Sequence, residues 1–472
     1  MACIIHEFLF AEYINVTIIF HSYTQKITLD KLKTLYSKHL DKWSRRFTEA
    51  CEINKLDGII VFSGSQNTRF RDDNKYPFYS EPYFNALIPQ VFPNSAIKIM
   101  PEDKPVLVHT ESTDFWHKSP ETPSGFWTNY FKILTVSDEK EMLEVLEISS
   151  DKLAAIGENA PLLAEFSTIN DQALFDYLDF HRAYKTEYEI ACITEANKIA
   201  ATGHAVVQKK LTLKTNKYSE FELNQIYCNE TQQRESELPY QNIVALNEHA
   251  STLHYQNLNK KAPETFHSFL LDAGATFNGY ASDITRTISE KKSNFENLIK
   301  SINELQQNIC AEAKSGVSFI FLNELTHVLL AGVLKENNLI KAEAEEIIYE
   351  RGITKFFLPH GLGHLLGLQV HDKGGYLSTP DGKHIKPSKD HPFLRLTRHL
   401  EPNFVLTIEP GIYFIPSLLE KLKSSSSSNL INWTEVEKMM VYGGVRIEDN
   451  ILVTHGEHLN LTRSAFKKVA LS

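Results

Sequence analysis

Two aspartates lie on either side of a predicted β-hairpin, at a spacing that brings their carboxylates together. The dipeptide Asn278-Gly279 is a strong hairpin signal between the apolar runs that contain Asp272 and Asp283. With this dipeptide as the turn, Asp272 faces Thr285 across the ladder, and Asp283 shares a face with Thr285. The two carboxylates are then diagonal neighbours, about 7–8 Å apart at the backbone. Such a pair needs a positive charge between them, as a metal ion provides; the alternative is two solvent-facing strand aspartates.

A glycine-rich segment over residues 359–372 offers nitrogen ligands. It contains His360, His364 and His371, and its three glycines allow close approach of the backbone. Imidazole is the usual nitrogen ligand of transition metals in proteins. A single histidine is more often a hydrogen-bonded core residue, but three in one glycine-rich stretch favour a functional loop.

Two apolar runs that are expected to be buried strands each carry a glutamate, Glu409 and Glu448. A buried unpaired carboxylate is costly, so each needs a cationic partner. Arg446 can serve Glu448, because the two share a strand face, but one arginine cannot serve four carboxylates. Four carboxylates and an imidazole suit two divalent ions, with manganese favoured over cobalt or zinc. Two such ions would hold a hydroxide and polarise the carbonyl under attack.

The elements that must position these groups fall into two parts. The chain of 472 residues exceeds the usual size of a single hydrophobic core, so two domains are expected. Thr186 and Glu189 have the spacing of a capping box, which predicts a long helix through Val207. We place the boundary just before this helix and expect an N-terminal domain over residues 32–182 and a catalytic domain over 183–472.

The N-terminal part is predicted to be a small mixed α/β domain. Apolar residues at helical spacing predict a helix over residues 32–56, and a turn then leads into a short buried strand ending at Phe62. Dense proline and aromatic residues over 76–93 predict irregular loops. Residues 1–31 carry no motif and are interpreted as an extension of unknown role. Further strands are predicted at residues 105–108 and 154–157.

Composition and charge exclude several classes of protein. A net charge of −10 and a pI near 6.0 argue against nucleic-acid binding and give no reason for attraction to an anionic membrane. Five scattered cysteines without a C-x-x-C pair indicate reduced thiols in the cytoplasm. The apolar run over residues 2–20 is interrupted by Glu7 and Glu12 and lacks a preceding basic residue, so we expect no signal peptide or membrane span.

Taken in order, these pieces resemble the creatinase/aminopeptidase P family of metallopeptidases, and most closely its bacterial proline dipeptidases. The match extends from about Leu32 to the end of the sequence. It implies an α/β (α+β) fold, with a creatinase-like N-terminal domain followed by a pita-bread domain around a curved antiparallel sheet. It also implies hydrolysis of Xaa-Pro dipeptides, and a homodimer. The segments that carry it are LLDAGATFNGYASDITRT, PHGLGHLLGLQVHD, LTIEPGIYF and GGVRIEDN, supported by PYQNIVALNEHASTLHY and HPFLRLTR.

The resemblance assigns five metal ligands and one acid/base. Asp283 and Glu448 would contact both ions. Glu409 would also pass a proton to the leaving proline nitrogen. The full implied ligand set is Asp272, Asp283, His364, Glu409 and Glu448.

Further residues are assigned to substrate by the same resemblance. His254 and His371 would act near the scissile bond, and His360 would line the pocket. Arg395 would bind the free C-terminal carboxylate as a bidentate pair, against the alternative of a surface cation. Arg446, also placed at the substrate site, would chiefly position Glu448 and its hydrogen-bond network.

At one position the sequence departs from the family pattern, and two alternative functions and one side activity are also considered. Leu87 stands where relatives supply a tryptophan that covers the neighbouring subunit's pocket, which bears on the substrate size accepted. An aminopeptidase P acting on longer peptides is the main alternative, although Arg395 and HLLGLQVHD favour the dipeptidase. A metal-free binding module would have lost ligands, yet all five are present. Hydrolysis of organophosphate triesters is an expected side activity.

Overall fold

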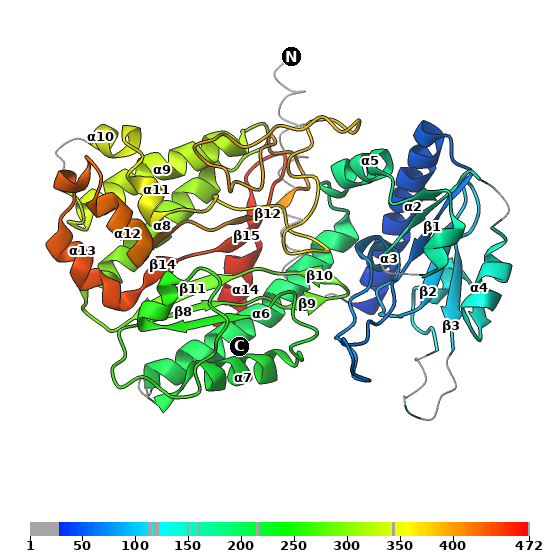
Figure 1. Cartoon of the computed structure of the whole chain (residues 1–472), viewed down its shortest axis with the longest axis horizontal. Coiled ribbons are helices and arrows are strands. Elements are labelled where there is room, and N and C mark those ends of the chain that lie inside the picture. Colours follow the sequence, from blue (N-terminus) through cyan, green and yellow to red (C-terminus); the bar gives the residue numbers. More distant parts are fainter. Residues whose placement is uncertain are drawn as a thin grey trace, which may run out of the picture.

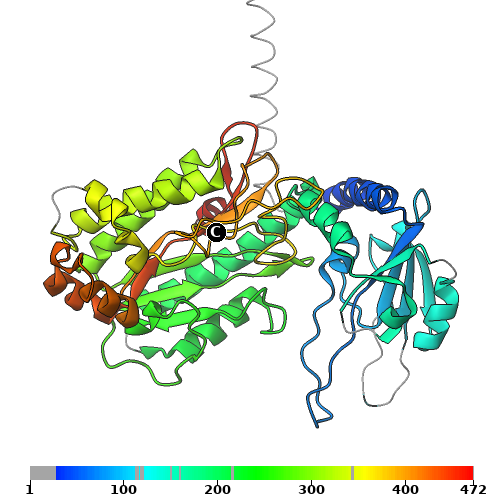
Figure 2. The same cartoon turned by 45° about the horizontal axis from the view of Figure 1, so that its top comes forward.

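The computed structural model describes residues 28–111, 116, 122–148, 151–158, 161–213, 217–341 and 345–470. Its elements form two α/β parts that lie side by side, with the candidate site residues in the larger, C-terminal part (Figures 1 and 2). The expected mixed α/β architecture is confirmed.

The N-terminal part is built on one mixed six-stranded sheet with the order β4-β3-β2-β1-β5-β6. Within β1, Ile59 and Val61 join the core that contains α2, whereas Ile60 and Phe62 join the core that contains Met142 of α4. This alternation follows from the two-residue period of a strand and puts helices on both faces. The elements are α2 (Leu29–Asn54), β1 (Gly58–Phe62), α3 (Pro82–Leu87), β2 (Ser95–Ile99), β3 (Val106–Thr110), β4 (Lys132–Val136), α4 (Glu139–Leu146), β5 (Leu153–Ile156), β6 (Thr168–Ile169) and α5 (Gln172–Arg182).

Two details of this part differ from the sequence prediction. Helix α2 begins at Leu29, after Thr28 caps it by accepting a hydrogen bond from the backbone of Lys31. Residues 29–31 therefore belong to a helix and not to an extension, while residues 1–27 lie outside the described ranges. The predicted irregular segment contains the short helix α3, which Glu81 caps at its N-terminus.

Leu87 lies in the core of the N-terminal part. Its side chain is 2% exposed, and its carbonyl accepts a hydrogen bond from the hydroxyl of Tyr36. A side chain buried in this way is not available to another subunit, so this position cannot supply the pocket cover that the resemblance implies.

The second part opens with the predicted capping box. The backbone of Thr186 donates to the Glu189 carboxylate at 2.6 Å, and its hydroxyl accepts from the backbone of Glu189 at 3.3 Å. Helix α6 (Glu187–Leu213) continues past the predicted end, because Val207 and Leu211 extend its buried stripe against α7 (Glu220–Thr231).

The strands of the second part pair antiparallel and lie between two groups of helices. Helices α6, α7 and α14 lie on one side, and α8 and α9 lie on the other (Figure 1). An isolated bridge from Thr285 to Glu448 joins two of the small sheets. The strands are β7 (Ile243–Leu246), β8 (Ser268–Asp272), β9 (Thr276–Phe277), β10 (Tyr280–Ala281), β11 (Thr285–Ser289), β12 (Val405–Ile408), β13 (Gly411–Tyr413), β14 (Gly444–Arg446), β15 (Asp449–Leu452) and β16 (Leu459–Asn460); the remaining helices are α8 (Asn294–Glu312), α9 (Phe319–Glu336), α10 (Glu345–Glu350), α11 (Thr354–Phe357), α12 (Pro416–Lys423), α13 (Trp433–Met439) and α14 (Leu461–Val469).

Within the described ranges, no helix combines the length and apolar character that crossing a membrane requires.

Candidate metal centre and substrate pocket

The predicted hairpin register is confirmed. Asp272 faces Thr285 in the pairing of β8 with β11. Asn278 and Gly279 have φ angles of 49° and 84°, the left-handed conformation that a two-residue hairpin turn requires. The backbone thus brings Asp272 and Asp283 to one face.

A tyrosine that the sequence reading left without a role joins these aspartates. The hydroxyl of Tyr240 lies 2.8 Å from Asp272 Oδ1 and 2.6 Å from Asp283 Oδ1, and the residue is partly buried beside the site. The signal available in the sequence was its place between Pro239 and Gln241, in the PYQN segment. That position alone does not indicate a contact with residues more than thirty positions away.

Three of the predicted ligands converge on one point. One potential ligand atom from each of Asp283, His364 and Glu448 lies within 4.8 Å of the other two. The Nδ1 atom of His364 contacts the carbonyl of Leu365 at 3.0 Å, so its Nε2 atom is directed to the carboxylates. This atom lies 3.4 Å from Asp283 Oδ2 and 3.6 Å from Glu409 Oε1.

A glycine fixes the position of the histidine loop. A Cβ atom at Gly363 would lie 2.1 Å from the carbonyl oxygen of Thr407, so only glycine allows the loop to approach β12 this closely. The approach places the backbone of His364 3.1 Å from the Thr407 hydroxyl, which accepts its hydrogen bond.

The sequence predicts both glutamates within buried strands, but both lie at interruptions between strands. Glu409 separates β12 from β13, and Glu448 separates β14 from β15. The Oε2 atom of Glu448 accepts a hydrogen bond of 2.7 Å from Thr285, and Oε1 has no hydrogen-bond partner among the described residues. An interruption of the ladder turns each carboxylate toward the centre while the flanking strands remain paired.

Arg446 forms its direct ion pair with Asp272 and reaches Glu448 through Thr285. The Nη2 atom of Arg446 lies 2.6 Å from Asp272 Oδ2, and its other nitrogens donate to Thr285 and to the Tyr413 hydroxyl. The same Thr285 hydroxyl donates to Glu448, so the predicted link between Arg446 and the hydrogen-bond network of Glu448 is present, although without direct contact.

The carboxylates of the cluster shift one another's pKa. Burial raises the pKa of Asp272 to about 6 and that of Glu409 to about 7. The pKa of Glu448 is raised far above its ordinary value, first by burial and then by the charge of Asp283. Burial acts to raise the pKa of Asp283 as well, but the contact with His364 outweighs it and lowers that pKa. The arrangement holds more negative charge than its own cations neutralise.

These residues fit a divalent metal. Buried carboxylates that raise each other's pKa are stabilised by a cation, and Glu448 Oε1 is a buried acceptor with no partner among the described residues. Arg446 ion-pairs with Asp272, and among the described residues no arginine or lysine forms an ion pair with the other three carboxylates. An oxygen-rich set with one imidazole matches hard or borderline divalent ions.

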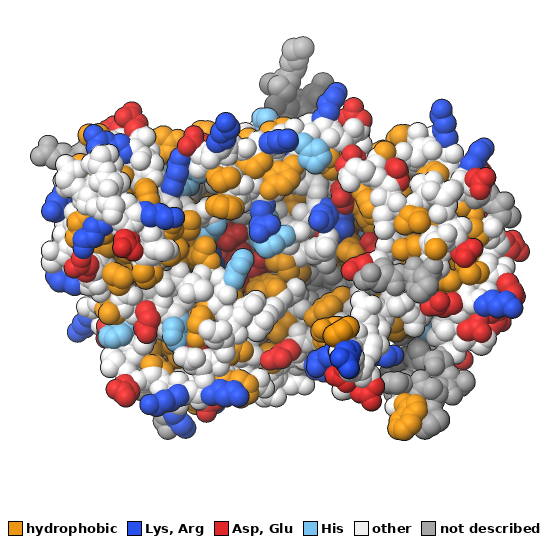
Figure 3. All heavy atoms as spheres, viewed as in Figure 1, with side chains coloured by type: hydrophobic (Ala, Val, Ile, Leu, Met, Phe, Trp, Pro, Cys, Tyr) orange, Lys and Arg blue, Asp and Glu red, His pale blue; other side chains and the backbone are white. Residues whose placement is uncertain are grey.

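All ten predicted site residues line one cavity of about 590 Å³. Acidic and histidine side chains gather in a hollow at the middle of the face shown in Figure 3. The His371 ring lies 4.5 Å from that of His364, and His360 contacts the Tyr413 hydroxyl at 2.8 Å. Burial lowers the pKa of both His360 and His371 to about 3, so both imidazoles are neutral near pH 7. His254 and Arg395 complete the wall.

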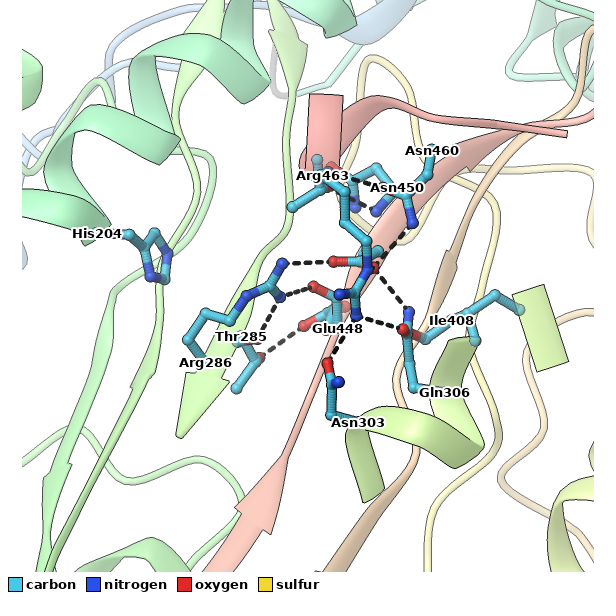
Figure 4. A network of polar contacts seen from close by, with 12 residues as sticks. His204, Thr285, Arg286, Asn303, Gln306, Ile408, Glu448, Asn450, Asn460 and Arg463 are labelled. Carbon is cyan, nitrogen blue, oxygen red and sulfur yellow. Dashed lines mark hydrogen bonds and ion pairs between the residues drawn. The ribbon is translucent and has the colours of Figure 1, made fainter. Parts of the chain in front are cut away.

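A second polar network supports Glu448 from behind the strand (Figure 4). The guanidinium of Arg286 donates to the carbonyl of Glu448 at 2.7 Å and to the carboxylate of Asp449 at 2.6 Å. Arg463 of α14 donates to the same carboxylate at 2.6 Å, and Gln306 does so at 3.0 Å. Asp449 was not assigned a role from the sequence, although it follows a predicted ligand directly.

Family models match most of the chain. The model described as "Metallopeptidase family M24" matches residues 191–455, and the model described as "Xaa-Pro dipeptidase, N-terminal domain" matches residues 34–180.

Curated relatives match over nearly their full length. A protein from Shewanella pealeana named Xaa-Pro dipeptidase is 42% identical over 440 residues, which cover 92% of this chain and 99% of the relative. A protein of the same name from Pseudoalteromonas haloplanktis is also 42% identical over 440 residues, with the same coverage.

Solved structures share the fold at low sequence identity. The low-pH form of Escherichia coli aminopeptidase P superposes with a TM-score of 0.70 at 20% identity, and the match covers 95% of this chain and 98% of that one. Proline aminopeptidase P II from Yersinia pestis gives a TM-score of 0.65 at 21% identity, covering 91% and 100%. With both family models and these relatives in agreement, the chain belongs to metallopeptidase family M24, with the pita-bread fold, and is a hydrolase.

Proposed function

We propose that the chain is a binuclear-metal Xaa-Pro dipeptidase that releases C-terminal proline from dipeptides. The observation that carries the proposal is that the acidic cluster and Arg395 line the same cavity of about 590 Å³. A guanidinium can bind a free carboxylate in a bidentate pair, which selects a short substrate that ends close to the cut. The relatives named Xaa-Pro dipeptidase support the same substrate class.

The proposed metal ligands divide between two ions, with manganese favoured by the oxygen-rich set and cobalt or zinc as alternatives. Asp272 would hold one ion, His364 and Glu409 would hold the other, and Asp283 and Glu448 would contribute to both sites. When bound, two divalent cations supply the positive charge that activates water and polarises the carbonyl of the scissile bond.

The chain's own side chains then move protons and hold the substrate. Glu409, which lines the cavity beside His364, would take a proton from the attacking water and return it to the proline nitrogen. His371 is neutral and donates one hydrogen bond to the oxygen on which negative charge develops, with His254 beside it. His360 lines the pocket, and Arg446 holds Asp272 and Tyr413 in place.

The proposal includes four properties of the whole protein. The domains span residues 32–182 and 183–472, with the first turn of α2 added to the former. The protein acts in the cytoplasm as a homodimer, binds neither nucleic acid nor membrane, and hydrolyses organophosphate triesters as a side reaction.

The first experiment measures proline release by chelator-treated protein before and after Mn²⁺ is added back. Gly-Pro, Ala-Pro, Leu-Pro and an Xaa-Pro-Xaa tripeptide are the substrates. Manganese-dependent cleavage of the dipeptides alone is the expected result. Cleavage of the tripeptide would indicate aminopeptidase P activity instead, and metal binding without any cleavage would indicate a binding module.

The role of Arg395 is tested with two variants. Arg395→Ala should raise KM for Ala-Pro by about 10- to 100-fold, the range expected for losing a hydrogen-bonded charge. Arg395→Lys keeps the charge without the bidentate geometry and should recover only part of the loss. An unchanged KM in Arg395→Ala would rule out the carboxylate role.

A further inference from the structure

Glu220 is a buried carboxylate outside the catalytic pocket. It is the first residue of α7 and is 1% exposed. Its Oε1 accepts hydrogen bonds from the Leu246 backbone at 2.9 Å and from His249 Nδ1 at 2.7 Å. Its Oε2 accepts from the Tyr255 hydroxyl at 2.7 Å and from the Asn259 backbone at 2.8 Å. Four donors therefore converge on one side chain.

All four donors belong to one segment, residues 246–259. This segment contains Leu253 and His254, both of which line the catalytic cavity. The ring of His249 stacks on that of Tyr255 with centroids 4.6 Å apart and an interplanar angle of 18°. The two ends of the segment, Leu246 and Asn259, both donate hydrogen bonds to the Glu220 carboxylate. Together with the ring stack, these bonds restrict the positions that the backbone between them can take.

Glu220 must be ionised to accept hydrogen bonds from all four donors. Burial acts to raise its pKa, but the hydrogen bonds from His249, Leu246, Tyr255 and Asn259 outweigh burial and lower it. The carboxylate is therefore ionised near pH 7 and accepts on both oxygens. A neutral glutamine would turn an NH₂ group toward two of the four donors and could not accept from all of them.

We propose that Glu220 is a positioning residue that holds His254 in the wall of the substrate pocket. The inference rests on the proposed dipeptidase function, since the readout is substrate turnover. Among the described residues, all four hydrogen bonds to the Glu220 carboxylate come from the 246–259 loop and none from a predicted metal ligand, so its effect on the substrate is expected to pass through this loop.

A double-mutant cycle tests the proposal with metal-loaded protein and Ala-Pro. Glu220→Gln should lower kcat/KM by about tenfold or more, because charged hydrogen bonds in the buried loop are lost. In a His254→Ala background the same change should have little further effect, since both act through one side chain. Mn²⁺ affinity should stay unchanged. Equal effects of Glu220→Gln in both backgrounds would overturn the proposal. Such additivity would mean that Glu220 and His254 affect kcat/KM independently, as a purely structural defect at Glu220 would.

A matched control lies two residues along the same helix. Glu222 also accepts hydrogen bonds at the start of α7, from the backbone and hydroxyl of Ser219, but it does not touch the 246–259 loop. Glu222→Gln should leave kcat/KM within about twofold. Tyr255→Phe removes a single donor and serves if Glu220→Gln does not fold; it should show a smaller loss that again disappears in the His254→Ala background.

Hydrogen exchange separates a failure of this inference from a failure of the proposed function. Amides of residues 246–259 should exchange faster in Glu220→Gln than in the native protein, whatever substrate the enzyme uses. Unchanged exchange in this loop would overturn the positioning role even if dipeptides are cleaved. Faster exchange in a protein that cleaves no dipeptide would support the positioning of the 246–259 loop by Glu220 and would reject only the dipeptidase function.

Discussion

At the scale of single residues, Glu448 is a buried carboxylate that neighbouring carboxylates repel. Its buried carboxylate has the charges of Asp283 and Glu409 nearby, and one of its oxygens has no partner among the described residues. A group placed in this way destabilises the metal-free fold and stabilises the metal-bound one. Function at this site is therefore obtained at a cost in stability without metal.

Replacing Glu448 should separate these two effects. In chelator-treated protein, Glu448→Gln should keep or increase the free energy of unfolding by about 1–3 kcal/mol, because a repelled buried charge is removed. With Mn²⁺, the native protein should gain stability by mass action, and the variant should gain much less. Urea unfolding with and without metal measures both.

The control for this variant is Glu312→Gln, at a half-exposed carboxylate in the last turn of α8. It should change the free energy of unfolding, with or without Mn²⁺, by no more than about 0.5 kcal/mol. A full metal-induced gain of stability in Glu448→Gln would remove Glu448 from the ligand set.

Each predicted site residue stands in a local pattern that can be read without the fold, and the structure brings all ten to one cavity. The sequence did not predict Tyr240 as the group that joins the two aspartates, nor Arg446 as the partner of Asp272. Those contacts span separations of 32 and 174 residues. Which arginine meets which carboxylate depends on how sheets are placed against one another, and no short-range pattern encodes that.

At the scale of elements, predictions succeeded where one local signal dominated. The Asn278-Gly279 turn and the Thr186–Glu189 capping box both appear as predicted. Boundaries were less accurate, because α6 extends to Leu213 through packing against α7. The breaks at Glu409 and Glu448 were not predicted, since an apolar run gives no sign of where a ladder stops.

The network around Asp449 joins three elements behind the metal ligands. Asp449→Asn should lower the free energy of unfolding by about 3–5 kcal/mol, because it leaves Arg286 and Arg463 beside a neutral group. Asp390→Asn is a control at a mostly exposed carboxylate that pairs with Lys355, and it should cost less than about 1 kcal/mol. Urea unfolding of both variants measures the difference; equal costs would show that the network does not stabilise the fold.

At the scale of the whole molecule, a buried ion cluster connects the two parts. Asp372, next to His371, lies 2.5 Å from Arg182 at the end of α5 and 2.7 Å from Lys185 in the connection to α6. A Cβ atom at Gly367 would lie 2.3 Å from the Asp372 carboxylate, so a glycine is needed there. The catalytic histidine loop is thereby tied to the N-terminal part.

This cluster makes a pH dependence predictable. Burial acts to raise the pKa of Asp372, but Arg182 and Lys185 outweigh it and lower that pKa. A depressed folded pKa stabilises the protein above the unfolded value of about 3.9 and ceases to do so as pH falls through the folded value. Asp372→Asn should therefore cost about 3–5 kcal/mol at neutral pH and progressively less below about pH 4.

Urea unfolding of native and variant protein across that range measures the difference. Asp381→Asn is the control at an exposed carboxylate, whose pKa is also lowered, chiefly by the Thr379 hydroxyl; because water screens this group, it should show only a small convergence. A difference that stays constant down to the lowest pH would exclude Asp372 as the titrating group.

The connection between the two parts should also resist proteolysis. Arg182 and Lys185 are 1% and 3% exposed, whereas Arg69, Arg71 and Lys75 lie in an exposed loop. Brief trypsin treatment should cut at these three loop sites well before it cuts at Arg182 or Lys185. Mass spectrometry of the first fragments identifies the cuts; early cleavage at Arg182 would mean that the two parts separate readily in solution.

The ion pair between Arg463 and Asp449 also has a consequence for synthesis. A ribosome adds Asp272 and Asp283 long before it adds Arg446, Glu448 and the helix that carries Arg463. Until residues 444–469 leave the exit tunnel, the nascent hairpin lacks Arg446, the ion-pair partner of Asp272, and Glu448, which is one of the proposed ligands. The proposed metal site is therefore complete only after this last part of the chain has been made.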